Sequence, residues 1–229
     1  MYFPIFSILT AIFEITIAVI IFRITGRKLI RYTSAILLLL LAVYQILEIL
    51  ICSISQNNLF LSKLAFMIII WLPPTGILLI SFLFPIKKKL VFGYSLFFFG
   101  LSFLMVIWII FRQDFVTQTV CSVIFARFTN PKMIYILYSI LYQFGLFSML
   151  FLSVLGVMKS KDLLQKKLLR QILFGVMSFI FPALLTVIAV PATRGALPSI
   201  MCHFALFLAI FISRLIYLEN KFNCKKRER

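Results

Sequence analysis

Four acidic or basic side chains stand inside long apolar runs of this sequence, where such groups are rare. They are Glu14, Glu48, His203 and Arg214. An ionisable group in hydrocarbon costs about 2.5–3.5 kcal/mol on insertion scales, so it normally faces the interior of a helical bundle and pairs there. Intramembrane groups of this kind bind polar molecules or carry protons, which makes these residues the first candidates for a functional site.

Five polar residues are predicted to meet near one end of two of these runs. At about 100° per residue, Gln45 and Glu48 share an arc of one helix. Ser199, Cys202 and His203 share a face of another helix. Glu48 and His203 lie at the same depth, roughly 6 Å below the outer boundary. We therefore predict contact between Glu48 and His203, and a ligand-binding polar cavity bordered by all five residues.

Glu14 and Arg214 form a second candidate pair, between the first and the last run. Glu14 falls near the middle of its run and Arg214 slightly toward the cytoplasmic end of its own, within roughly one helical turn of depth. A buried ion pair is one expectation, because a charge in the bundle interior needs a partner. The alternative is that the Arg214 side chain extends to the lipid headgroups instead.

The elements that position these residues are predicted to be transmembrane helices. Of the 229 residues, 63% are hydrophobic and only 13% are charged, which is far from the composition of soluble domains. Runs of about 20 apolar residues have the length that an α-helix needs to cross hydrocarbon, and the alternation typical of barrel strands is missing. The runs lie at 3–22, 32–52, 64–85, 90–111, 133–158, 172–190 and 199–218. We predict an all-α polytopic membrane protein with seven transmembrane helices in a single domain, residues 1–229.

Lys and Arg residues gather in alternate connections between the runs. Seventeen of them lie after the first, third and fifth runs and in the tail, against five in the opposite connections. This positive-inside pattern predicts an outer N-terminus and a cytoplasmic C-terminus. The net charge of +17 therefore indicates the lipid bilayer, with anionic headgroups at the cytoplasmic basic loops, and no nucleic acid. A small-molecule ligand and a cytoplasmic protein are further candidate partners.

Three more features concern the ends and bends of the helices. A disulfide between Cys52 and Cys121 is expected if the outer compartment is oxidising, and free apolar cysteines are the alternative. The connection 112–132 mixes charged and apolar residues, which indicates an amphipathic cap across the helix ends. Pro73 and Pro182 predict kinks that leave carbonyl acceptors free, a feature of cavities and of ordinary transmembrane helices alike.

Several enzyme classes do not fit the ionisable residues. His203 is the only histidine, and Asp114 and Asp162 lie in connections on opposite sides of the membrane. These residues exclude a paired-aspartate protease and argue against a zinc site. Ser199 and His203 have the spacing of a dyad, but no acid other than Glu48 is near enough to orient the histidine. We expect no metal, no cofactor and no enzymatic activity.

Two short motifs give the chain a likeness to a known family. Gln45-Ile-Leu-Glu48 stands in the second run and Ser199-Ile-Met-Cys202 in the last. With these motifs the chain resembles a family of small bacterial seven-span membrane proteins of unknown function. It departs from the family pattern at its start, MYFPIFS, and at His203, where the family has Phe. The resemblance implies that the four motif residues form one cluster and that the protein lies in a bacterial inner membrane.

A second resemblance is to the seven-helix sensory region that precedes some bacterial histidine kinases. It rests on Leu47-Glu48, on LPPTGILLISFLF and on KKLLRQILFGVMSFIFP. It implies sensing of a ligand or of the membrane state, with the signal leaving through the last span. Because the chain stops at Arg229, the output would need a separate partner.

These observations lead to one main hypothesis and two alternatives. The main hypothesis is that the protein binds a small molecule, or senses the membrane state, through the polar cavity in the outer half of the bundle. The first alternative is a small-solute or proton-coupled transporter, with Glu14 and Glu48 as titrating groups. The second is a structural or assembly subunit, whose buried polar residues fix only the helix packing.

Overall fold

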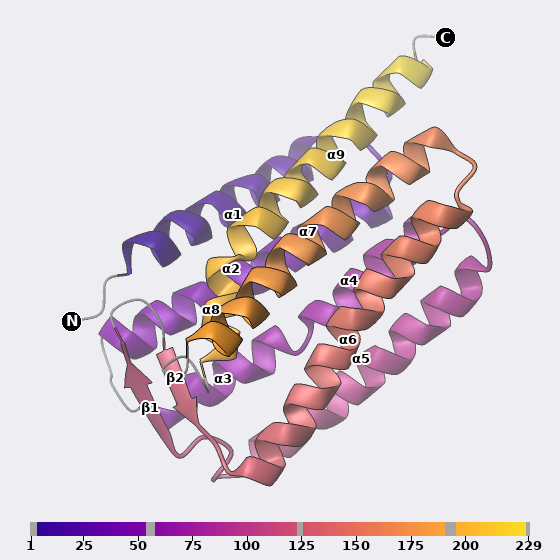
Figure 1. Cartoon of the computed structure of the whole chain (residues 1–229). Helices are drawn as coiled ribbons and strands as arrows, with labels where there is room; N and C mark the ends of the chain where they lie inside the picture. Colours follow the sequence, from indigo (N-terminus) through magenta and orange to yellow (C-terminus); the bar gives the residue numbers. More distant parts are fainter. Residues whose placement is uncertain (1–3, 54–57, 123–125, 191–195, 228–229) are drawn as a thin grey trace.

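The protein is a bundle of long apolar helices with one small β-hairpin (Figure 1). A computed structural model describes residues 4–53, 58–122, 126–190 and 196–227, with the backbone alone at residues 132, 134 and 223–227. Of the Lys and Arg residues counted above, Arg194 and Arg229 lie outside the described residues. The elements are α1 (Ile5–Arg23), α2 (Lys28–Ser53), α3 (Leu59–Ile69), α4 (Leu72–Leu83), α5 (Lys88–Phe111), β1 (Gln118–Cys121), β2 (Ala126–Thr129), α6 (Lys132–Lys159), α7 (Leu163–Ala189), α8 (Leu197–His203) and α9 (Ala205–Arg227).

Six helical stretches are long and apolar enough to cross a membrane, with α3 and α4 counted together as Leu59–Leu83. The pair α8 and α9 passes the same test but is bent by 46°, so that the described residues provide six or up to seven spans. The all-α membrane architecture predicted from hydropathy is confirmed at this level. Large apolar side chains on the outside of the bundle fit a lipid surround, with Leu9 60% exposed, Phe97 58% and Phe151 62%.

The bundle packs around α2 and α4. Helix α1 lies along α2 and also touches α9, whereas α4 contacts α2, α5 and α6. Helix α7 lies between α6 and α9 (Figure 1). The burial follows from helical periodicity, since the inward faces of α2 carry residues such as Leu38, Leu41 and Ile51, each fully buried.

The described part of the connection 112–132 forms an antiparallel pair of strands, which gives the predicted amphipathic cap the form of a β-hairpin. Its strands pair Gln118 with Thr129 and Cys121 with Ala126, and residues 123–125 of the predicted cap lie outside the described residues. Side chains alternate inward and outward along both strands, which is the period of a half-buried strand and not of a helix. The ring of Phe128 packs inward, edge-on to Phe66 of α3, so the hairpin covers the helix ends.

The predicted bend at the prolines of the third run is a break between α3 and α4, at Ile70 and Trp71. Pro74 has no N–H for the carbonyl of Ile70, and that carbonyl accepts a hydrogen bond from Ser102 Oγ of α5 at 3.2 Å. Ser95 Oγ of α5 donates to the carbonyl of Pro74 at 3.0 Å. The carbonyl that Pro74 leaves free is thus satisfied by a neighbouring helix. Helix α7 continues through its own proline.

The two ends of the bundle differ in charge. The hairpin end carries β1, β2 and the first turns of α3, α6 and α8. The basic end carries the connections from α1 to α2, from α4 to α5 and from α6 to α7, together with the end of α9. At the basic end the Arg27 guanidinium forms an ion pair with Glu219 of α9 through two parallel hydrogen bonds. This contact fixes the end of α9 to the α1–α2 connection.

Candidate functional site

The predicted site residues come together where α2 meets α8, beneath the hairpin. Ser199 Oγ donates a hydrogen bond to Glu48 Oε1 at 2.6 Å, and the backbone N–H of Ala126 donates to Ser199 Oγ at 3.0 Å. Glu48 and Ser199 are 1% and 0% exposed. A carboxylate of α2, a hydroxyl of α8 and a backbone amide of β2 therefore form one buried relay.

A second pair of bonds lies at the end of α8. Gln45 Nε2 donates to the carbonyl of Cys202 at 3.3 Å, and His203 Nδ1 lies 2.8 Å from the carbonyl of Ser199. Since a carbonyl oxygen only accepts, the Nδ1 of His203 carries the hydrogen of this bond. Side chains thus occupy two carbonyls in the last turn of α8, just before the bend at Phe204. Side chains that bond to backbone carbonyls of a helix are a recognised cause of helix bends, which accounts for the bend at Phe204.

All five predicted ligand-binding residues belong to this group, which we call the α2–α8 cluster: Gln45, Glu48, Ser199, Cys202 and His203. The predicted contact between Glu48 and His203 is wrong. Glu48 bonds to Ser199, whereas the ring of His203 stacks on Phe6 of α1, with ring centres 5.7 Å apart. The reason is that His203 turns back along its own helix to the Ser199 carbonyl.

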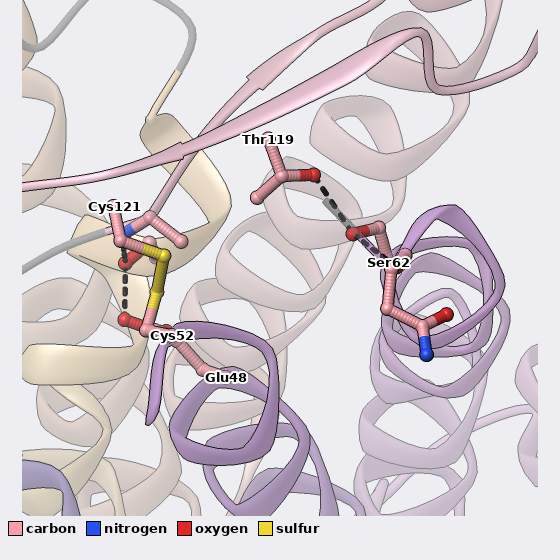
Figure 2. Close-up of a disulfide and its surroundings, with 8 residues drawn as sticks. Glu48, Cys52, Ser62, Thr119 and Cys121 are labelled. Carbon is pink, nitrogen blue, oxygen red and sulfur yellow. Dashed lines mark hydrogen bonds between the residues drawn. A yellow bond between two sulfur atoms is a disulfide. The ribbon is translucent and has the colours of Figure 1, made fainter. Parts of the chain in front are cut away.

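The hairpin above the cluster is held to the helices at three points. A disulfide joins Cys121 of β1 to Cys52, which follows Glu48 by one turn of α2 (Figure 2). Thr119 of β1 and Ser62 of α3 share a buried hydrogen bond of 2.8 Å between their hydroxyls. The third point is the Ala126 amide described above. The hairpin therefore couples α2, α3 and α8 at this end of the bundle.

The predicted ion pair between Glu14 and Arg214 is wrong. Glu14 is fully buried in α1, and neither carboxylate oxygen has a hydrogen-bond partner within the described residues. Arg214 is exposed on α9, on the same stripe as Ile210 and Tyr217. The exposed face of α9 is directed away from the bundle interior in which Glu14 is buried, which agrees with the alternative that the Arg214 side chain extends outward.

Buried polar groups that sequence reasoning had not connected lie beside the cluster. The Tyr44 hydroxyl and the Gln143 Oε1 are buried without a hydrogen-bond partner in the described part of the chain. A cavity of about 10 Å³ lies between α6 and α8, lined by Tyr138, Tyr142, Gln143 and Met201 among others. This volume suits about one water molecule and no larger ligand. The tyrosine spacing of α6 was the available signal, and it is typical of packing faces as well.

Larger pockets lie away from the cluster. Three pockets of about 450 to 580 Å³ are lined by described residues, and none of these three includes a residue of the cluster. Two are at the basic end and one is an apolar groove between α5 and α6. Within the described residues no group of three His, Cys, Asp or Glu side chains has the arrangement to hold a metal ion.

The chemistry available to the cluster follows from its bonds. An amide, a carboxylate, a hydroxyl, a thiol and an imidazole are present, but each hydrogen bond observed among them joins one helix to another element or closes a turn. The cluster therefore joins α2, α8 and the hairpin.

No protein-family model matches this sequence, and no curated protein is significantly similar to it.

Proposed function

We propose that the protein is a membrane sensor in which the hairpin and the α2–α8 cluster respond to a small molecule or to the membrane state. The observation that carries this proposal is the relay from Ala126 through Ser199 to Glu48. It ties the hairpin to the bent pair α8 and α9. A change at the hairpin therefore acts directly on the helix that runs to the other end.

The far end of that helix supports the same proposal. Helix α9 has 23 residues, about 35 Å at 1.5 Å per residue, and extends beyond its neighbours at the basic end (Figure 1). There Glu219 pairs with Arg27, and Thr25 Oγ1 donates to Asn220 Oδ1 at 2.8 Å. Movement of α9 would change these contacts, and a cytoplasmic protein could read that change.

The orientation in the membrane is part of the proposal. Counting α8 and α9 as one bent span gives seven spans, and the seventeen cations then lie on one side. By the positive-inside rule the hairpin and N-terminus face outward and the end of α9 is cytoplasmic, in a bacterial inner membrane. Reporter fusions after Lys161 and after Glu219 test this: both should report the cytoplasm, and a periplasmic signal from either would refute the orientation.

Hydrogen–deuterium exchange of the full chain in nanodiscs tests the sensor proposal. Ser199→Ala removes the relay hydroxyl, and Ser153→Ala removes another fully buried hydroxyl, which lies on α6. We expect Ser199→Ala to speed exchange at both the hairpin and the distant contacts around Arg27 and Glu219, and Ser153→Ala to leave both unchanged. Faster exchange confined to the hairpin and α8 would refute the sensor proposal and favour a structural subunit.

A second candidate is the proton-coupled transporter, which one observation favours. Glu14 is fully buried with both oxygens free of hydrogen bonds within the described residues, as expected for a group that carries a proton. Proton flux into proteoliposomes tests it, with Glu14→Gln as the variant. Flux that this variant abolishes would establish transport in place of sensing, and flux at the level of empty liposomes would remove the transporter.

A further inference from the structure

We infer that a groove at the basic end, between the first turns of α2 and α5, binds one anionic phospholipid. The groove has a volume of about 580 Å³. Its polar side is formed by Lys28, Lys88 and Lys89, and its apolar side by Leu29, Phe82 and Phe92 among others. This inference is independent of the proposed function, since it holds for a sensor, a transporter or a structural subunit.

The lysines of the groove are free to bind an anion. Within the described residues, Lys28, Lys88 and Lys89 are exposed and make no hydrogen bond or ion pair. Two neighbouring arginines differ in this respect. Arg27 also lines the groove but pairs with Glu219, and Arg31 donates to carbonyls at the end of α1. The groove thus presents three uncompensated positive charges, and none of its lining residues is acidic.

The backbone adds to the positive potential. Lys28 is the first residue of α2, and Lys88 is the first residue of α5. The first turn of a helix has backbone N–H groups without an intrahelical acceptor and carries the positive end of the helix dipole. Two helix starts and three lysines therefore converge on one groove, which is an arrangement that favours a phosphate.

The apolar side distinguishes a lipid from a soluble anion. Leu29 is 60% exposed and Phe92 is 40% exposed, each next to or one turn beyond the lysines along the same helices. A phosphate ion alone would leave these side chains uncovered. A phospholipid covers both sides, with its phosphate at the lysines and an acyl chain along Phe82 and Phe92. In the groove the lysines come first and the apolar side chains follow, as the headgroup and the acyl chains do in a phospholipid, and this favours a lipid with a net negative headgroup.

Lipid titration of the delipidated full-length protein in a neutral detergent tests the inference. The probes are a short-chain phosphatidylglycerol, the matching phosphatidylcholine and inorganic phosphate. Lys88→Gln with Lys89→Gln removes two groove charges. The control, Lys166→Gln with Lys167→Gln, removes two adjacent charges at the same end but outside the groove.

We expect the unaltered protein to prefer phosphatidylglycerol over phosphatidylcholine. The groove variant should lose about fivefold in affinity per lysine, about 25-fold in all, whereas the control variant should keep the preference. Phe92→Ala should weaken binding of the lipid. Equal losses in both lysine variants would overturn the inference, because they would indicate general surface charge. The inference would also be overturned if inorganic phosphate displaced the lipid at a concentration similar to that of the lipid and if Phe92→Ala had no effect on lipid binding.

Discussion

Removal of the Ser199 hydroxyl is the most direct test of the relay beneath the hairpin. Ser199→Ala deletes the donor to Glu48 Oε1 and the acceptor of the Ala126 amide. Hydrogen bonds between transmembrane helices average about 0.6 kcal/mol, which sets a lower bound near 1 kcal/mol for two bonds. A buried donor left without its acceptor costs about 1–3 kcal/mol, and the Ala126 amide loses its acceptor in this variant. Because the amide belongs to the hairpin and not to a transmembrane helix, we expect a loss of about 2–3 kcal/mol.

The loss is measured as the free energy of unfolding in mixed micelles with a rising fraction of dodecyl sulfate, followed by circular dichroism with the disulfide intact. Ser153→Ala is the matched control. Ser153 is also 0% exposed, but its Oγ has no hydrogen-bond partner within the described residues. The two variants remove the same atom from equally buried places, so their difference reports the bonds. A difference below about 0.5 kcal/mol would refute the relay as a stabilising contact.

Three further predictions concern the disulfide, the packing of α6 and the contact at the basic end. Cys52→Ser opens a link across a sequence separation of 69 residues, and the chain-entropy estimate predicts a loss of about 4 kcal/mol, measured as unfolding with and without reductant. Gly145→Ala would place a Cβ 2.6 Å from a proline side chain of α4, so the free energy of unfolding should fall by about 1–3 kcal/mol. The control is Gly93→Ala, where the new Cβ meets no atom within 4 Å, and this variant should keep the melting temperature or raise it. Arg27→Ala breaks the ion pair with Glu219 and should lower the free energy of unfolding by about 1–2 kcal/mol. The loss should be smaller at high salt, because Arg27 is 41% exposed and salt screens exposed charges. A loss that is independent of salt would contradict this prediction.

Helical phase within one element was predictable from the residues. Gln45 and Glu48 were expected on one face of the second run, and both are buried there. Ser199 and Cys202 were expected on one face as well, and the structure brings that face to α2. These predictions needed only the rotation per residue and the cost of exposing a polar group to lipid.

The partner of each polar group was not predictable in the same way. Depth alone suggested His203 for Glu48, but Ser199 lies one turn away on the same face and points its hydroxyl at the carboxylate. The Ser102 hydroxyl that satisfies the carbonyl of Ile70 is 32 residues distant and gives no local signal. Such choices depend on how two helices rotate and slide against each other, which neither helix encodes alone.

By itself the sequence determined that this is a helical membrane protein with one strongly basic end. Hydrocarbon offers the backbone no hydrogen-bond partners, so a chain this apolar has almost no alternative to long helices. Only the tertiary structure decided that residues 118–121 pair with residues 126–129, that the last span bends at Phe204 and that Arg214 faces away from Glu14. These features depend on contacts between residues far apart in the chain, such as Glu48 and Ser199 at a sequence separation of 151, and local patterns carry no record of such contacts.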